Sequence, residues 1–345
     1  MYVYTISESP KIAITTVQSV LVILNIVGNS LVCVAILKNK DMRTPINYLL
    51  INLAVADMTA ATFFLAQYIF LSPSAHPNGV FGTALCRLVT GATAAYIGSA
   101  ASVATLVTIA TERYFAVIHP LGTRLKLTTR KLKVIIICSW IFGVFMNIPM
   151  FFFGEYDEEE DECTEVYPEV WIEKAYSVTW FLFTAFLPVS FMIALYTRVV
   201  YSLWFKHGQH KTQQVLVRVR KRVTLMVVTV SVIFGVCWLA DSINYILTTF
   251  TSIYDSSDLS YVTTGTLVLF NSAINPFVYA LVNHQFRVNI KAMICCRCRP
   301  ASRRHSDISK LSTVGSEVLN EIRLTNIKKL LEEERLEPSK ISVSS

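Results

Sequence analysis

Seven long apolar runs separated by short polar connections dominate the pattern of the chain. The runs cover residues 12–37, 46–71, 84–115, 132–153, 175–205, 216–250 and 259–282. Each run exceeds the roughly 20 apolar residues that a helix needs to cross a bilayer. The first is also longer than the apolar part of a cleaved signal, about 7–15 residues. The pattern therefore predicts an all-α membrane protein, a seven-transmembrane helix bundle.

Basic residues are distributed unevenly among the polar connections. The first, third and fifth connections carry Lys38, Lys40, Arg43, Arg124, Lys126, Arg130, Lys131, Lys133, Lys206, Lys211, Arg218, Arg220, Lys221 and Arg222. The fourth connection is acidic, with eight carboxylates in the eleven positions 155–165. Because basic residues mark the cytoplasmic side of a membrane protein, we expect an extracellular N-terminus and a cytoplasmic C-terminus in a multi-pass plasma-membrane protein.

Composition agrees with a chain that has little soluble structure. The 345 residues are 53% hydrophobic and 16% charged, whereas soluble domains carry roughly 25% charged residues. The net charge of +7 lies mainly on the cytoplasmic side, where it faces anionic membrane lipids, so it does not indicate nucleic-acid binding. No arrangement of His, Cys and Asp has catalytic spacing, so we expect no enzyme activity.

These patterns divide the chain into four parts. The predicted parts are a short extracellular N-terminus, the seven-helix bundle, a short amphipathic eighth helix along the membrane with a cysteine cluster, and a flexible cytoplasmic tail: residues 1–11, 12–282, 283–299 and 300–345.

Polar residues inside the apolar runs require an explanation, because an ionisable side chain at mid-membrane costs on the order of 2.5–3.5 kcal/mol. Asp57 lies midway along the second run, and other runs carry amides and hydroxyls at comparable depth: Asn29, Ser102, Asn271, Ser272 and Asn275. Oxygen ligands suit a small hard cation. A protonated carboxyl in a hydrogen-bonded packing cluster is the alternative.

Several prolines and aromatic residues also lie within the runs. Pro149, Pro188 and Pro276 each remove a backbone hydrogen bond and can kink a helix. Tyr196 follows Pro188 and Tyr279 follows Pro276, toward the end where Arg113 lies. Phe234 and Trp238 are one helical turn apart and share a face, so they are either core aromatics or a moving pair.

The runs carry motifs in a fixed order, one to a span. They are Gly28-Asn29, Leu53-Ala54-Val55-Ala56-Asp57, Glu112-Arg113-Tyr114 with Pro120, Trp140, Pro188 with Tyr196, Phe234-Gly235-Val236-Cys237-Trp238, and Asn275-Pro276-Phe277-Val278-Tyr279. With these motifs the chain resembles a rhodopsin-like (class A) G-protein-coupled receptor over about residues 12–299. It is most similar to the neuropeptide-receptor branch of that family.

The resemblance implies roles for particular residues. Glu112 and Arg113 would form an ionic latch that opens on activation, and Arg113 and Leu121 would then contact a heterotrimeric G protein. The other members of the activation switch would be Tyr114, Tyr196, Pro188, Val103, Phe234, Trp238, Asn275, Pro276 and Tyr279. An allosteric sodium ion, and no other cofactor, would bind Asp57, Asn29, Ser102, Asn271 and Asn275. A disulfide would join Cys86 to Cys163.

Two departures from the family pattern affect the outer halves of the spans. Ala240 stands where the family usually has a proline, so any bend in the sixth span must come from packing or water. Cys86 lies 27 residues before Arg113, about two more than usual. We therefore expect a bulge or a later helix start at the outer end of the third span.

Two acidic features indicate the class of ligand. Asp241 lies three residues after Trp238, on nearly the same helix face, and the acidic connection can attract cations over about 8 Å at physiological salt. We expect a basic, possibly amidated, neuropeptide that enters near Asp241, Gln67 and Tyr245. The other candidate ligand residues are Tyr96, Ser99, Trp238 and Tyr261. The seventh run has no lysine for a retinal Schiff base, which disfavours an opsin.

Other interpretations remain open from the sequence. In one alternative, the acidic connection is only a solvated surface that binds no ligand. The chain would then be a class A receptor for a non-peptide ligand. An ion-coupled transporter that uses Asp57 is the rival class, although transporters commonly contain inverted repeats that are absent here.

The end of the chain predicts regulation by modification. Cysteines next to basic residues after the last span fit palmitoylation: Cys295, Cys296 and Cys298. Arg303 and Arg304 precede candidate phosphorylation sites at Ser306, Ser309 and Ser312, where added charge would create a contact for arrestin. Expected partners are thus the peptide, a G protein, arrestin, receptor kinases and membrane lipids.

Overall fold

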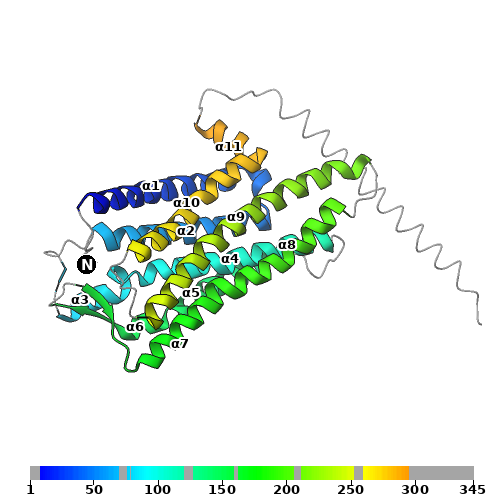
Figure 1. Ribbon diagram of the computed structural model, residues 1–345. Coiled ribbons are helices and arrows are strands. Elements are labelled where there is room, and N and C mark those ends of the chain that lie inside the picture. Colours follow the sequence, from blue (N-terminus) through cyan, green and yellow to red (C-terminus); the bar gives the residue numbers. More distant parts are fainter. Residues whose placement is uncertain are drawn as a thin grey trace, which may run out of the picture.

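The protein is a bundle of long helices that run roughly along one direction (Figure 1). The computed structural model describes residues 8–69, 76–77, 79–119, 127–158, 162–205, 211–251 and 259–294. Six of the helical segments in these ranges are long and apolar enough to cross a membrane: 12–38, 45–64, 79–118, 170–205, 220–250 and 262–282. They correspond to six of the seven predicted runs.

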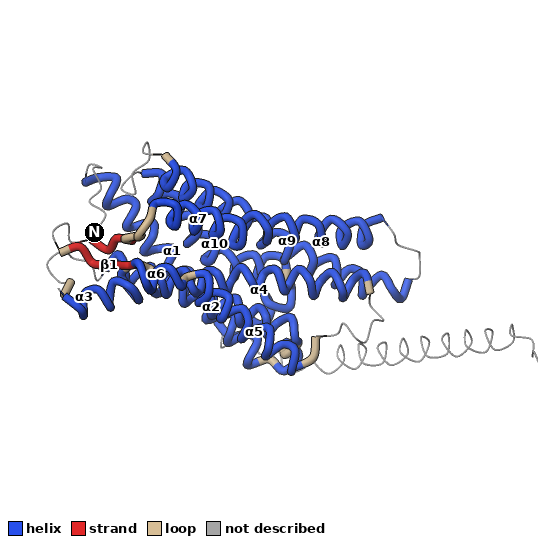
Figure 2. Tube along the Cα trace, turned by 90° about the horizontal axis from the view of Figure 1, so that it is seen from below, coloured by secondary structure: helices blue, strands red, loops and turns tan. Residues whose placement is uncertain are grey.

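The first three runs form α1 (Glu8–Lys38), α2 (Pro45–Ile69) and a third span of two helices. A short helical turn, η1 (Lys40–Met42), joins α1 to α2. The third span consists of α3 (Gly79–Leu85), the π-helical segment η2 (Cys86–Thr90) and α4 (Thr93–Ile118). Helix α4 lies at the centre, because it packs against α2, α5, α8 and α9 (Figure 2).

The bulge expected at the outer end of the third span is present. Segment η2 is a wider π-helical stretch, and Ala92 after it has a left-handed backbone with φ of 60°. Gly91 has no room for a side chain, because a Cβ there would lie 2.7 Å from the carbonyl oxygen of Cys86. The extra residues between Cys86 and Arg113 are thus absorbed before α4 begins at Thr93.

The fourth run is broken rather than continuous. Helix α5 (Thr129–Met146) ends at Asn147, and the short α6 (Ile148–Phe153) begins immediately after it. Pro149 lies in the first turn of α6, where its missing N–H costs no helical hydrogen bond. The predicted run 132–153 thus consists of two helices, and the break at Asn147 lies two residues before Pro149, one of the prolines predicted to kink a helix.

The fifth and sixth spans are longer than the predicted runs. The fifth consists of α7 (Val170–Trp180), a π-helical segment η4 (Phe181–Phe186) and α8 (Leu187–Phe205). The sixth is α9 (Lys211–Phe250), an unbroken helix of 40 residues. It continues through Ala240 because no proline interrupts its hydrogen bonds there.

The seventh span, α10 (Leu259–Val282), contains Pro276 and is followed by α11 (His284–Ile294). Phe286 of α11 is fully buried, and its ring centre lies 5.8 Å from that of Tyr279. Helix α11 packs against α1 and α10. Its predicted position along a membrane surface and the tail that follows stay predictions.

Small residues allow the helices to approach closely. A Cβ on Gly28 of α1 would lie 2.9 Å from Cγ of Pro276 in α10. A Cβ on Gly98 of α4 would lie 2.8 Å from the carbonyl oxygen of Ala56 in α2. Both distances are too short for a side chain, so these glycines set the spacing of the bundle.

The acidic connection folds into a hairpin, which the hydrophobic pattern did not predict. Strands β1 (Gly154–Asp157) and β2 (Glu162–Glu165) pair in antiparallel register, with Tyr156 opposite Cys163. The hairpin lies at one end of the bundle, beside α3 and α6 (Figures 1 and 2). The disulfide between Cys86 and Cys163, with a Cα–Cα distance of 5.7 Å, ties it to η2.

Candidate functional site

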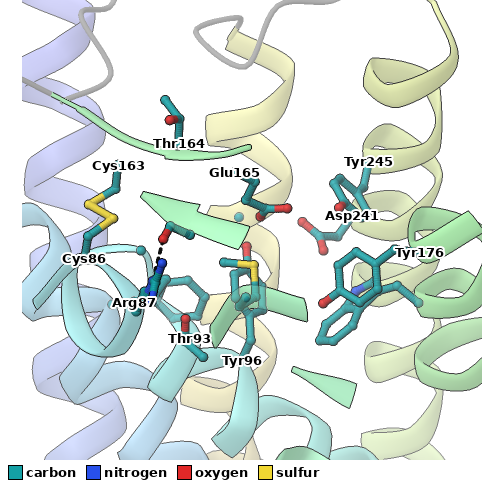
Figure 3. Close-up of a pocket in the computed structure, with 17 residues that line it drawn as sticks. Cys86, Arg87, Thr93, Tyr96, Cys163, Thr164, Glu165, Tyr176, Asp241 and Tyr245 are labelled. Carbon is teal, nitrogen blue, oxygen red and sulfur yellow. Dashed lines mark hydrogen bonds between the residues drawn. A yellow bond between two sulfur atoms is a disulfide. The ribbon is translucent and has the colours of Figure 1, made fainter. Parts of the chain in front are cut away.

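A pocket lies in the bundle beneath the β1–β2 hairpin (Figure 3). The cavity has a volume of about 100 Å³. Its lining comes from α2, η2, α4, α6, the hairpin, α7, α9 and α10: Phe64, Cys86, Arg87, Gly91, Ala92, Thr93, Tyr96, Met150, Gly154, Cys163, Thr164, Glu165, Tyr176, Trp180, Asp241, Tyr245 and Gly265. The disulfide therefore holds β2 as one wall of the pocket.

Three charged side chains line this pocket. Asp241 enters from α9 and is hydrogen-bonded to Thr264 of α10. Glu165 enters from β2 and accepts a hydrogen bond from Tyr167. Arg87 lies on the side of the disulfide, and its Nε donates to the carbonyl oxygen of Gly154 at 2.7 Å (Figure 3). Two carboxylates and one guanidinium make the pocket acidic overall.

The environment of Glu165 changes its titration. Glu165 as a whole residue is exposed to solvent, but the protein atoms around its carboxylate raise its pKa above the usual range for a glutamate. The hydrogen bond from Tyr167 opposes this rise, and the nearby charge of Glu173 on α7 adds to it. A cation placed beside Glu165 would favour the ionised form and offset the cost of burial.

Aromatic side chains connect the pocket to the middle of the bundle. The ring of Tyr96 lies 5.6 Å from that of Trp180, in an edge-on arrangement. Trp180 is 6.4 Å from Trp238, and Trp238 is 5.8 Å from Phe234, between ring centres. Tyr176 also contacts Trp180, at 6.2 Å. The rings thus form a continuous path from the pocket wall to the buried part of α9.

The structure brings together only some of the residues expected to contact a ligand. Tyr96, Asp241 and Tyr245 line the pocket. Ser99 and Trp238 are nearly fully buried and are not part of its lining, so their contact with a ligand stays a prediction. The side chains of two other candidates lie outside the described part: Gln67 and Tyr261.

Sequence reasoning missed several contributors to the pocket, among them Trp180, Tyr176 and Arg87. Trp180 and Tyr176 gave no signal beyond being aromatic residues in an apolar run, which usually indicates core packing. Arg87 was visible as a basic residue next to Cys86, at the outer end of a span where basic residues are scarce. Its position could have marked it as a functional candidate.

Some of the polar residues predicted to surround Asp57 contact it directly. Asp57 is fully buried, and its two carboxylate oxygens accept hydrogen bonds from Ser102 Oγ at 2.9 Å and Asn275 Nδ2 at 2.7 Å. The amide of Asn29 donates to the carbonyl oxygen of Ser272 at 3.3 Å. Three amide oxygens of the expected sodium ligand set are buried without a hydrogen-bond partner: those of Asn29, Asn271 and Asn275.

At the opposite end of α4, Glu112 forms an ion pair with Arg113. Both side chains are largely shielded, with 20% and 13% of their surface exposed, respectively. The nearby phenols make no hydrogen bond with each other: the hydroxyl of Tyr196 accepts from Ser231 at 3.2 Å, and that of Tyr279 is buried without a partner. Pro188, Val103 and Phe234 are buried between these two ends.

Several predicted sites lie outside the described residues. They are the G-protein contact Leu121, the lipidation cysteines Cys295, Cys296 and Cys298, and the phosphorylation sites Ser306, Ser309 and Ser312.

Comparison with known proteins gives one family. The family model described as 7 transmembrane receptor (rhodopsin family) matches residues 28–279, which is more than half of the chain. The chain is 27% identical to a QRFP-like peptide receptor of Branchiostoma floridae, over 91% of this chain and 85% of that protein. It is 26% identical to the pyroglutamylated RF-amide peptide receptor of Rattus norvegicus, over 86% of this chain and 72% of that protein. It is 30% identical to the substance-K receptor of the same species, over 81% of this chain and 74% of that protein.

Proposed function

The chain belongs to the rhodopsin family of seven-transmembrane receptors, and from that premise we propose that it is a plasma-membrane receptor for a basic, possibly amidated, peptide. It is a multi-pass membrane protein, and its family is one of signalling receptors rather than enzymes. Its relatives include receptors for RF-amide, tachykinin and allatostatin-A peptides. This family match favours a receptor over the ion-coupled transporter.

One observation carries the peptide proposal: the pocket beneath the hairpin has Asp241 in its wall. A carboxylate with no described basic partner favours a cationic group in the ligand. The pocket also extends to the acidic hairpin, whose charges would attract a basic peptide and raise its rate of capture.

The positions of pocket and ion pair support a receptor mechanism. Thr93 in the pocket and Arg113 lie about 30 Å apart along α4, at a rise of about 1.5 Å per residue, which is close to the thickness of a bilayer. We infer that the pocket faces the outside and that Arg113 faces the cytoplasm. The abundance of basic residues near the Arg113 end supports this orientation.

Activation in this proposal is a shift between two populations, since the peptide must bind the active form more tightly than the inactive one. A peptide that contacts Tyr96 or Tyr176 would press on Trp180 and so on Trp238. A change in the packing of Phe234 would then alter α9 near its cytoplasmic half. Arg113 would leave Glu112 and contact the G protein together with Leu121.

The cluster around Asp57 fits a sodium ion. One carboxylate with hydroxyl and amide oxygens is a donor set suited to a hard cation, and the buried amide oxygens of Asn271 and Asn275 lack other partners. In this proposal Asp57, Asn29, Ser102, Asn271 and Asn275 hold sodium in the inactive form. Replacing sodium with a bulky organic cation should then raise ligand-free nucleotide exchange, and Asp57→Asn should remove that response.

The cytoplasmic partners follow from the same proposal. Receptor kinases would phosphorylate the tail at Ser306, Ser309 and Ser312, arrestin would bind the phosphorylated tail, and lipid chains on Cys295, Cys296 and Cys298 would hold the end of α11 at the membrane.

The decisive experiment measures guanine-nucleotide exchange in membranes that contain the receptor and a G protein of broad specificity. A library of basic, C-terminally amidated peptides is compared with neutral peptides of matched length. At least one basic peptide should stimulate exchange, and Asp241→Asn should reduce its potency tenfold or more. If no basic peptide stimulates exchange, or if neutral peptides are equally potent, the proposed ligand class is wrong.

A further inference from the structure

Two carboxylates from elements far apart in sequence enter the same pocket. Asp241 comes from the membrane-spanning α9, whereas Glu165 comes from β2 of the hairpin. Figure 3 shows both carboxylates turned toward the same part of the pocket, near Tyr245. Each accepts a neutral hydrogen bond, from Thr264 and Tyr167 respectively, and within the described ranges neither forms an ion pair.

Such an arrangement is unfavourable without a cation. Each carboxylate loses part of its hydration in the pocket, and the neutral hydrogen bonds replace only part of what is lost. The hairpin cannot easily move Glu165 away, because Cys163, two residues before it, is covalently tied to Cys86. A positive group between the carboxylates would compensate both for the hydration that they lose in the pocket.

A second, independent feature of the pocket indicates a missing polar partner. Thr93, at the start of α4, is fully buried and lines the pocket, but its hydroxyl has no hydrogen-bond partner. A buried hydroxyl without a partner is costly. It is therefore expected to bond a polar group of the ligand.

We propose that Glu165 and Asp241 together bind a single guanidinium group of the ligand, while Thr93 bonds a neighbouring polar group. This inference rests on the proposed function and narrows it to ligands that carry arginine. A guanidinium has five N–H donors in a rigid plane, so it can face one carboxylate on each edge. An ammonium is a compact, strongly hydrated charge and fits two separated carboxylates less well.

Arg87 determines where in the pocket the cation binds. Its guanidinium lies on the side of the disulfide, held through Nε to the carbonyl oxygen of Gly154 at 2.7 Å. It repels a second cation from that side and favours an acceptor, such as a peptide carbonyl. The arginine of the ligand is thus directed to the side of α9 and β2.

The test uses purified receptor and small probes, so that it does not depend on finding the natural ligand. Thermal unfolding is followed with millimolar Nα-acetyl-arginine amide, its neutral citrulline analogue of nearly the same shape, or Nα-acetyl-lysine amide. A probe that binds only the folded protein raises the unfolding temperature. The variants are Glu165→Gln and Asp241→Asn. Glu169→Gln is the matched control, because Glu169 is exposed, lines no described pocket and makes no side-chain cap to α7.

The arginine probe should raise the unfolding temperature of the unmodified receptor and of Glu169→Gln by a few degrees, the lysine probe by less, and the citrulline probe not at all. Either carboxylate substitution should abolish the rise. An equal response to citrulline, or a Glu165→Gln variant that responds like the control, would overturn the shared site. An equal response to lysine would overturn its preference for guanidinium. The peptide library tests the ligand class separately, since this result does not depend on activation.

Discussion

Replacing Glu112 with glutamine should make the receptor more active in the absence of ligand. In the structure the carboxylate of Glu112 holds the guanidinium of Arg113, and the two residues are neighbours on α4. The ion pair therefore does not tie two helices together. Instead it fixes the direction of one side chain. Glutamine keeps the size of the side chain but removes its charge, so Arg113 becomes free to meet a partner.

The magnitude follows from the burial of the pair. Exposed ion pairs contribute about 0–1 kcal/mol, and hydrogen bonds to charged groups contribute about 1.5–3 kcal/mol. Because only 13% of Arg113 and 20% of Glu112 is exposed, we expect about 1.4 kcal/mol. That energy corresponds to a tenfold rise in the ratio of active to inactive receptor.

The assay is ligand-free nucleotide exchange, normalised to the amount of folded receptor at the membrane. Glu112→Asp is the control, because it keeps the charge on a shorter side chain and should raise exchange less than Glu112→Gln. An unchanged or lower basal rate in Glu112→Gln, at normal receptor levels, would refute the view that this carboxylate restrains Arg113.

Three further predictions concern packing, covalent structure and pH. Gly98→Ala should lower the free energy of unfolding by about 1–3 kcal/mol, since the new Cβ would lie 2.8 Å from a backbone oxygen of α2 that cannot move alone. Thermal unfolding measures this loss, and Gly265→Ala is the control, because a Cβ at Gly265 would meet open space. Cys163→Ser should lower the free energy of unfolding by about 4.5 kcal/mol in the chain-entropy model, because the disulfide spans 77 residues. An unmodified receptor that is equally stable with and without a reducing agent would contradict this. The potency of a basic peptide should fall as the pH drops through the raised pKa of Glu165, because only the ionised carboxylate attracts the cation. Concentration–response curves at several pH values measure this, and in Glu165→Gln the potency should depend less on pH.

Much of the bundle was predictable because its signals are local. A membrane-spanning helix needs a continuous apolar segment, and that requirement is visible in the runs themselves. The cluster around Asp57 was also predictable, since polar residues buried in lipid must find one another. The bulge before α4 followed from a count of residues between Cys86 and Arg113.

Other features depended on contacts that no local pattern records. The hairpin arose in a segment whose eight carboxylates suggested only a charged surface, because pairing of β1 with β2 and the link to Cys86 decide its shape. The break at Asn147 and the burial of Ser99 likewise depend on neighbouring helices.

The sequence by itself determined the helices, their order and the residues that carry charge into the membrane, because apolar length and the cost of burying charge act within each segment. Only the tertiary structure decided that Glu165 and Asp241 share a pocket and that Trp180 connects this pocket to Trp238. These residues lie on separate elements, and the packing of the helices and the disulfide alone bring them together.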